Sequence, residues 1–220
     1  LGVVAGITPF NFPAMVPLWM APMAIVCGNT FVLKPSERDP SSSMLLAKLF
    51  KEAGVPDGVF NVVQGDYRVG QMLSRHPDIA KVSFTGESGT GKKVMADAAG
   101  TLKDITMELG GKSPLIVFDD AKLNNAVSAA MLANFYTQGE ICTNGTRVFV
   151  QAGIKDAFVA RLLERTKSNI VAGEPMNPEV NFGALISAKH QQLVMSYIEK
   201  GKAEGATLAA GGHVLKPTGN

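Results

Sequence analysis

The sequence predicts an α/β fold with a parallel sheet, because short β-branched runs alternate with helical patterns along almost all of its 220 residues. Strands that are separated by helices pair in parallel through right-handed crossovers. The hydrophobic fraction of 46% is enough to bury a sizeable core. In open parallel sheets ligands bind at the carboxyl ends of the strands, so we expect the chemistry there.

Seven short segments have the composition and the boundaries of strands. In chain order they are LGVVAGI (1–7), TFVLKP (30–35), VFNVVQG (59–65), AKVSFTG (80–86), DITMELG (104–110), PLIVFDD (114–120) and TRVFVQ (146–151). The sequence contains no internal repeat and no low-complexity linker. The glycine pair in ELGGKSP marks the boundary that we predict between two domains, 1–108 and 109–220.

Helices are predicted in the gaps between these strands. The clearest helix has Asp39 as its N-cap and Pro40 in its first turn, and it ends at Gly54. Another helix runs from about Asn124 to Tyr136 and leads the chain to Cys142. Apolar residues at helical spacing predict two further helices, around 154–163 and 193–198.

The charge of the chain indicates small-molecule partners. The formal net charge is +2 and the basic residues are scattered, so neither a nucleic-acid surface nor a membrane-surface helix is predicted. The longest apolar run, Met15 to Cys27, is interrupted by Pro17 and Pro22 and is too short to span a membrane. No signal peptide is recognisable.

Two cysteines, Cys27 and Cys142, are too few for a disulfide scaffold, and no C-x-x-C metal spacing is present. We therefore expect a reducing, cytoplasmic setting and no metal site. The chain begins with LGVV rather than a methionine and stops at KPTGN, so we expect an internal piece of a longer protein.

The segment FTGESGTGKKV follows an apolar strand and opens a helix, a layout that suits a pyrophosphate. Gly86, Gly91 and Lys92 fit the G-x-x-x-x-G-K of a P-loop NTPase, and PLIVFDD resembles a strand that ends at a magnesium-binding aspartate. The next residue, Lys93, replaces the hydroxyl that should ligate the metal. The dinucleotide motif G-x-G-x-x-G is absent too, and a tight turn would also explain the glycines.

A carboxylate gives a second indication of a nucleotide. Lys34 ends a predicted strand and Glu37 follows three residues later. An acidic residue in this position can accept both ribose hydroxyls of NAD, and its charge disfavours the 2′-phosphate of NADP. An exposed Lys/Glu pair on a loop is the alternative.

Cys142 is a candidate nucleophile, because it lies in a small polar loop where backbone N–H groups can stabilise a thiolate or an oxyanion. Cys27 lies in an apolar segment, and there we expect a buried, inert side chain. The histidines give no base for a Cys-His dyad. Asn11, between two prolines, can donate to an oxyanion, and Glu108, beside two glycines, can act as a general base.

Taken together, these residues resemble the aldehyde dehydrogenase superfamily across essentially all 220 residues. The resemblance is carried by five ordered matches: Asn11 in N-F-P, Lys34 with Glu37 in K-P-S-E, the F-T-G loop from Phe84 to Gly91, Glu108 in E-L-G-G-K, and Cys142. It implies that the G-x-x-x-x-G-K match is a coincidence. One departure is Glu87, where many members have a serine that contacts the pyrophosphate.

The resemblance implies a fold and a cofactor. It implies a Rossmann-like NAD-binding domain in 1–108, an α/β catalytic domain in 109–220, and a homo-oligomer as the full-length protein. NADP stays open, since Lys34 and Arg38 can tolerate an extra phosphate. The implied cofactor-binding residues are Lys34, Glu37, Phe84, Thr85, Gly86, Glu87, Gly91, Leu109 and Gly110.

The resemblance also implies a mechanism and a substrate. Cys142 attacks an aldehyde, Asn11 holds the oxyanion, hydride leaves to NAD, and Glu108 activates water against the thioester. Residues 9–41 look like CoA-acylating methylmalonate-semialdehyde dehydrogenases, whereas residues 107–151 look like betaine-aldehyde dehydrogenases. Glu108 favours hydrolysis, and betaine aldehyde is the expected substrate. The implied aromatic contacts for its cation are Phe12, Trp19 and Tyr136.

Overall fold

The computed structural model describes residues 1–215 and divides into two compact units, Leu1–Gly110 and Gly111–Asn220. This division falls two residues after the boundary that we predicted, and the role of each domain stays a prediction. The terminal KPTGN segment lies outside the described residues. It was one of the two observations from which we expected an internal piece of a longer protein. No helix within 1–215 is both long and apolar enough to cross a membrane.

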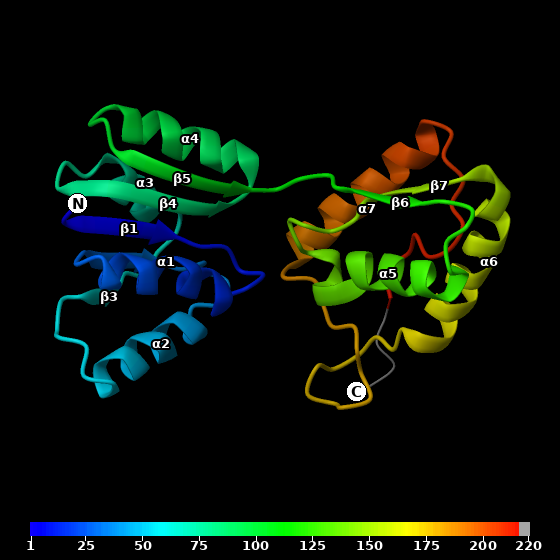
Figure 1. The fold of residues 1–220 in the computed structure, drawn as a ribbon, viewed down its shortest axis with the longest axis horizontal. Coiled ribbons are helices and arrows are strands. Elements are labelled where there is room, and N and C mark those ends of the chain that lie inside the picture. Colours follow the sequence, from blue (N-terminus) through cyan, green and yellow to red (C-terminus); the bar gives the residue numbers. More distant parts are fainter. Residues whose placement is uncertain (216–220) are drawn as a thin grey trace. The chain divides into compact units, whose positions relative to one another are not determined.

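The first unit contains a five-stranded parallel sheet in the order β3-β2-β1-β4-β5 (Figure 1). The strands are β1 (Val3–Ile7), β2 (Thr30–Lys34), β3 (Phe60–Val62), β4 (Ile79–Gly86) and β5 (Asp104–Leu109). All five were predicted from the sequence. The parallel pairing confirms the α/β class, and β1 lies at the centre of the sheet.

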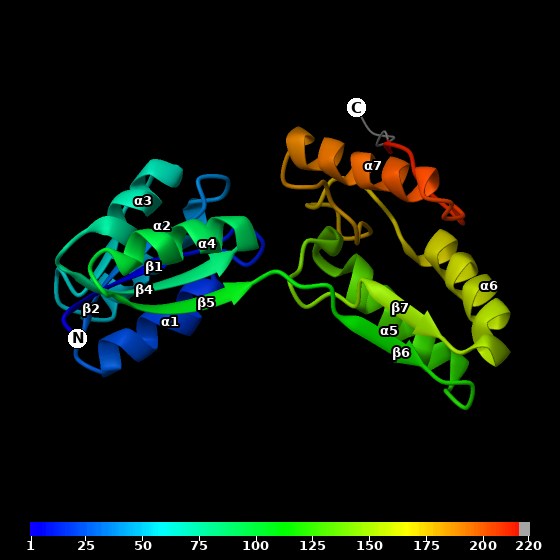
Figure 2. The ribbon, with the colours of Figure 1, turned by 90° about the horizontal axis from the view of Figure 1, so that it is seen from above.

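Helices cover both faces of this sheet. They are α1 (Met15–Val26), α2 (Ser41–Glu52), α3 (Tyr67–Arg75) and α4 (Ser88–Ala99). Ala5 and Ile7 of β1 pack in one cluster with Val94 of α4. Val4 points to the opposite face and packs in another cluster with Ala21 of α1. Figure 2 shows α1 on one side of the strands and α3 and α4 on the other.

Aromatic rings fill the face that α1 covers. The ring of Phe60 on β3 stacks on Phe50 of α2, with the centroids 4.5 Å apart, and α2 therefore lies on the same face as α1. The Phe31 ring of β2 packs over Gly6 of β1, where a Cβ atom would be 2.5 Å from the ring. A glycine in the centre of the sheet thus leaves room for the largest buried side chain of this unit.

The apolar run that contains two prolines forms α1, for which the sequence analysis gave no bounds beyond the expectation of helices between the strands. Pro17 lies in the first turn, where its missing N–H removes no intrahelical hydrogen bond, whereas Pro22 lies inside the helix. Burial of Val16, Pro17 and Ala21 stabilises the helix in spite of Pro22. The expectation of a buried Cys27 is wrong: Cys27 is the C-cap of α1 and its side chain is exposed.

The predicted N-cap of α2 is also wrong. The N-cap is Pro40, no side chain caps the helix, and Asp39 precedes it. The Oδ1 atom of Asp39 is buried without a hydrogen-bond partner, and burial raises the pKa of this carboxyl to about 6.

The second unit is built on two parallel strands, β6 (Pro114–Val117) and β7 (Arg147–Val150). Its core contains Val117, Val127 and Phe158, from β6 and from the helices that follow each strand. These helices and the later ones are α5 (Leu123–Phe135), the short 3-10 helix η1 (Tyr136–Gly139), α6 (Ala152–Asn169) and α7 (Ala188–Ala203). The three long helices that we predicted in this half of the chain are confirmed.

We predict that Leu33→Ala destabilises the first unit by about 2 to 5 kcal/mol, because a fully buried side chain in the α1 cluster is replaced by a cavity. The urea-unfolding midpoint measures the effect. Leu45→Ala is the control, since Leu45 on α2 is 56% exposed and its truncation should change stability by less than about 0.5 kcal/mol. Equal shifts of the two midpoints would contradict the described core.

Candidate active site

The predicted site residues of the first unit lie at the carboxyl ends of its parallel strands. Ile7, the last residue of β1, is in register with Lys34 on β2 and with Phe84 on β4. Thr85 on β4 is in register with Glu108 on β5. Because all strands run in the same direction, Lys34, Phe84, Thr85 and Glu108 share one edge of the sheet.

Two threonine hydroxyls at this edge are buried without a hydrogen-bond partner. Thr8 directly follows β1, and its N–H donates to the Lys34 carbonyl oxygen at 3.1 Å. The Oγ1 atoms of Thr8 and Thr85 have no partner within the described part of the chain. An unpaired buried hydroxyl costs about 1 to 3 kcal/mol, so both are suited to a ligand. The sequence analysis missed Thr8, although it is three residues before Asn11.

Asn11 and Phe12 lie in the segment that leads from β1 into α1. Both side chains are half-buried. The Phe12 carbonyl oxygen accepts a hydrogen bond from Val16 N–H at 3.2 Å, which ties this segment to the first turn of α1. The predicted oxyanion donor is therefore held on a short, anchored connection.

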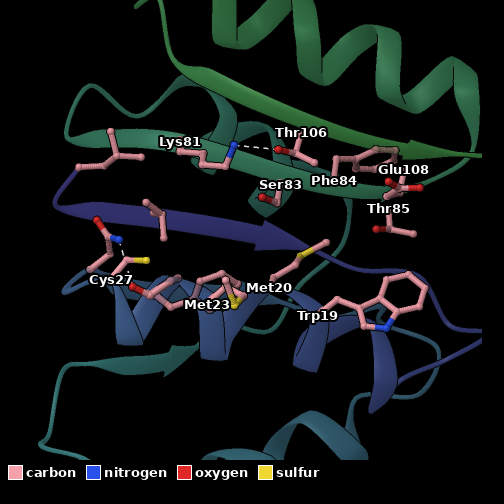
Figure 3. A pocket seen from close by; sticks show the side chains of 15 residues that line it. Trp19, Met20, Met23, Cys27, Lys81, Ser83, Phe84, Thr85, Thr106 and Glu108 are labelled. Atoms are coloured by element: carbon pink, nitrogen blue, oxygen red, sulfur yellow. Dashed lines mark hydrogen bonds between the residues drawn. The ribbon is translucent and has the colours of Figure 1, made fainter.

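A pocket of about 800 Å³ opens between α1 and the strands of the first unit (Figure 3). Trp19 of α1 borders one end of it, together with Thr85 and Glu108 (Figure 3). Trp19 is 50% exposed and the Glu108 side chain is exposed as well. Three predicted residues thus meet at one end of a cavity that water can enter. Phe12 does not line this pocket.

A second pocket in the same unit contains Lys34 and Glu37, together with Thr90 and Lys93 of α4. Lys34 is 4% exposed, which excludes the alternative of an exposed pair for the lysine. Its Nζ donates to the Pro35 carbonyl oxygen at 2.7 Å and lies 3.6 Å from Glu37 Oε2. An ammonium group has three donors, so this buried lysine retains hydrogen-bonding capacity for a ligand.

The junction of β4 and α4 differs from both phosphate-loop patterns. Glu87 is the only residue between the strand and the helix, because α4 begins at Ser88. A P-loop needs several non-helical residues to wrap around a phosphate, but the residues from Ser88 to Lys92 are helical. Lys93, in the position of the metal-binding hydroxyl, is one helical residue further on.

Glu87 caps α4. Its carboxylate accepts hydrogen bonds from Gly89 N–H at 2.6 Å and from Thr90 N–H at 2.9 Å. These bonds hold the pKa of Glu87 below its usual range. A pyrophosphate can use these two amides only by displacing the carboxylate. The Glu87 side chain thus folds back onto its own helix.

The remaining predicted cofactor residues lie around this junction. The Phe84 ring packs close to Gly86, where a Cβ atom would be 2.7 Å from the ring. Gly91 is buried against Leu109: a Cβ atom at Gly91 would be 2.7 Å from Leu109 Cδ2. Gly110 faces open space. Small residues here allow α4 to lie directly on the ends of β4 and β5.

Cys142 lies in a tight turn of the second unit, between η1 and β7. The turn is closed by a hydrogen bond from Asn144 N–H to the Ile141 carbonyl oxygen at 3.3 Å. The buried Asn144 amide also donates to the Gly139 carbonyl oxygen at 2.7 Å. The Cys142 side chain is partly exposed and is a free thiol. Tyr136, which begins η1, is 58% exposed.

Among the described residues, no group of three or more histidine, cysteine or acidic side chains is arranged to hold a metal ion. The first unit instead contains an amide, a carboxylate that borders a cavity, and a buried lysine beside a second carboxylate. The second unit contains a partly exposed thiol.

The family model for the aldehyde dehydrogenase family matches residues 1–220. The chain belongs to the aldehyde dehydrogenase family. This result disfavours the P-loop NTPase alternative, in agreement with the short β4–α4 junction.

Relatives within the aldehyde dehydrogenase family match over the whole chain. A betaine aldehyde dehydrogenase of Vibrio vulnificus is 62% identical over 219 residues, which are 100% of this chain and 45% of the relative. A crystal structure of an NAD-dependent aldehyde dehydrogenase from Sinorhizobium meliloti has a TM-score of 0.95 and 43% identity over 97% of this chain and 42% of that one.

A third relative is a betaine aldehyde dehydrogenase double mutant from Staphylococcus aureus, in complex with NAD+ and with a BME-modified cysteine. Its TM-score is 0.94 and its identity 38%, covering 98% of this chain and 43% of that one. The chain spans about half the length of the relatives that it matches.

We predict that Glu87→Ala destabilises α4 at pH 7, because the helix loses its cap. Loss of a cap costs about 0.5 to 2 kcal/mol, and we expect a value at the low end of this range because Glu87 is exposed to solvent. The folded pKa of Glu87 lies below the unfolded one, so the cap stabilises the protein above about pH 4.3, and this contribution is lost as the pH falls through the folded pKa.

Urea unfolding of both proteins between pH 7 and pH 3 measures this difference, which should shrink with acidification. Glu52→Ala, at an exposed pair 3.7 Å from Lys48, is the control and should have almost no effect. A Glu87→Ala effect that grows at low pH would show that the carboxylate is not a cap.

Proposed function

We propose that this chain carries the central part of an enzyme that oxidises an aldehyde to a carboxylic acid, with NAD as the oxidant and Cys142 as the nucleophile. The observation that carries the proposal is the match of all 220 residues to the aldehyde dehydrogenase family, with Cys142 in an accessible turn. The exposed Glu108 carboxylate at the end of a cavity supports it.

The residues of the first unit fit a dinucleotide. Lys34 has unused donors and Glu37 is exposed in the same pocket, so the two suit the hydroxyls of a ribose. The unpaired hydroxyls of Thr8 and Thr85 offer further hydrogen bonds at the same edge. Relatives described as NAD-dependent or bound to NAD+ support this choice. When bound, the nicotinamide accepts the hydride that the aldehyde carbon loses.

In the proposed first step, the Cys142 thiolate adds to the aldehyde carbon and a sulfur–carbon bond forms. The carbonyl oxygen becomes an oxyanion, which the Asn11 amide and the Cys142 backbone N–H stabilise as hydrogen-bond donors. Loss of hydride from the resulting thiohemiacetal leaves a thioester on Cys142. The accessible position of the thiol and the anchored position of Asn11 support these two roles.

In the proposed second step, Glu108 takes a proton from water while the water oxygen attacks the thioester carbon. The carbon–sulfur bond then breaks, the carboxylic acid is released, and the thiolate of Cys142 is regenerated. The exposure of Glu108 at the cavity end supports this role, because a general base for hydrolysis must reach solvent.

We propose betaine aldehyde as the substrate and glycine betaine as the product. The 62% identity to a betaine aldehyde dehydrogenase supports this choice. The exposed rings of Trp19 and Tyr136 and the half-buried ring of Phe12 are the proposed contacts for the trimethylammonium group, each worth about 0.5 to 2 kcal/mol. Glu108 disfavours the CoA-acylating alternative, which has no use for a base that activates water.

We further propose that the complete protein is a cytoplasmic homo-oligomer. The low number of cysteines supports the reducing setting. Light scattering of the purified protein measures the assembly, and a monomer would contradict this part.

We predict that Asn11→Ala lowers kcat about 10²-fold to 10³-fold, because one oxyanion donor is lost, while NAD affinity stays nearly unchanged. Cys142→Ser should abolish turnover. Steady-state kinetics and NAD binding by calorimetry measure these effects in the complete protein. Asn61→Ala, in β3 and away from the candidate site, is the matched control. Unchanged turnover in Asn11→Ala would remove this residue from the mechanism.

We predict that betaine aldehyde is oxidised with a higher kcat/KM than propanal and that CoA has no effect on the rate. An aromatic contact that favours the cation acts only on betaine aldehyde, so Trp19→Leu should lower kcat/KM for this substrate alone. NADH formation measures both rates with and without CoA. A strict requirement for CoA would reverse the choice between hydrolysis and acyl transfer.

A further inference from the structure

Two side chains that precede Cys142 bind the backbone of a distant segment of the second unit. The Gln138 Oε1 atom accepts a hydrogen bond from Gly183 N–H at 3.3 Å. The Glu140 Oε1 atom accepts one from Ile186 N–H at the same distance. Alternate residues of the segment before the cysteine thus attach at two points to the segment that leads into α7.

Glu140 has a second partner on α7. The His190 Nε2 atom is 3.4 Å from Glu140 Oε1. His190 itself lies in the first turn of α7, where its N–H donates to the Oγ atom of the N-cap Ser187 at 3.2 Å. The start of a helix favours negative charge, so the carboxylate is held by the imidazole of α7 and by the Ile186 amide of the segment just before the helix.

The Glu140 side chain is 7% exposed, in contrast to 35% for His190. Burial raises the pKa of Glu140, although the Ile186 N–H and His190 oppose this effect. A carboxylate that has lost most of its water depends on its protein partners, so its position is strongly determined. Nothing in the proposed chemistry uses Glu140 as an acid or a base.

The backbone beside Glu140 is strained. Thr137 and Gln138 have φ angles of 50° and 55°, and Gly139 has one of 77°. A left-handed conformation costs about 1 to 3 kcal/mol for a residue other than glycine. At Gly139 a Cβ atom would lie 2.9 Å from the Asn134 carbonyl oxygen, so only glycine fits. Such a turn keeps its shape only if neighbouring contacts hold it.

We propose that Glu140 is a positioning residue for Cys142, whose side chain clamps the cysteine-bearing turn to Ile186 N–H and His190. This inference rests on the proposed function, in which Cys142 is the nucleophile. Only one residue separates Glu140 from Cys142, so movement of the clamp moves the thiol. A displacement of about 1 Å from the reactive geometry can lower a rate about 10²-fold.

The test uses the complete protein with Cys27→Ser as the background, because Cys27 is exposed and would also react with alkylating agents. In this background Cys142 is the only cysteine within the 220 residues. Three quantities are measured. They are kcat per active site, with the active sites counted by titration, KM, and the pH dependence of Cys142 alkylation by iodoacetamide. Loss of folded protein lowers the number of titrated active sites but changes neither kcat per active site nor KM.

Glu140→Ala should lower kcat about 10-fold to 10²-fold, with a smaller change in KM, and should alter the alkylation profile. Glu140→Gln keeps an oxygen that accepts from Ile186 N–H and should recover most of the kcat. His190→Ala removes the other partner of Glu140, at a partly exposed site. It should also lower kcat, but by a smaller factor. Glu199→Ala, an exposed glutamate of α7 that pairs with Lys202, is the control and should leave all readouts unchanged.

Wild-type kcat and alkylation in Glu140→Ala would overturn the proposal, and so would a Glu140→Gln variant as impaired as Glu140→Ala. If Glu140→Ala does not fold, wild-type readouts in His190→Ala overturn it instead. The proposed function fails separately: if Cys142→Ser turns over normally, Cys142 is not the nucleophile, whatever the Glu140 variants do. An inactive Cys142→Ser together with unaffected Glu140 variants removes only the clamp.

Discussion

Parallel pairing of β1 with a strand on each side is the constraint on which the first unit depends. Because β1 is central, alternate side chains are buried on both faces, and the strand cannot shift by one residue without exchanging its two clusters. The same register fixes the carboxyl edge. Ile7 ends opposite Lys34 and Phe84, so the connection to Asn11 starts beside them. Packing of the sheet therefore determines where the polar groups of the candidate site begin.

The second unit presents its thiol in a different manner. Cys142 is not at the end of a strand that is buried on both sides, but in a turn that follows a run of left-handed residues. Its shape comes from side chains that bind backbone groups: Asn144 on one side, Gln138 and Glu140 on the other. A thiol on such a turn is partly exposed and yet restrained, which a flexible glycine loop would not achieve.

The sequence predicted the elements whose signal is local and missed those that depend on packing. Every strand within residues 1–215 was predicted, because β-branched runs between turn residues need no further context. The helix at 15–26 was expected only in general, as one of the helices between strands, and its bounds were not predicted, since Pro22 opposes helix formation and only burial outweighs it. Asp39 fits the composition of an N-cap, but α2 has Pro40 as its N-cap and no side-chain cap. The burial of Lys34 and the pairing of Glu140 with residues far along the chain are tertiary effects that composition does not contain.

Several residues of this chain have an unpaired buried polar group or an unfavourable backbone angle, and the positions of these residues are informative. Leu102 has a positive φ angle, yet it lies between α4 and the start of β5, at the opposite end of that strand from Glu108. One violation therefore does not identify a site. At the carboxyl edge of the sheet, in contrast, Thr8, Thr85 and Lys34 all retain unused hydrogen-bonding capacity within neighbouring strands. Thr85 lines the pocket beside α1 and Lys34 the pocket beside α4, so the proposed dinucleotide would have to reach both pockets to supply their missing partners.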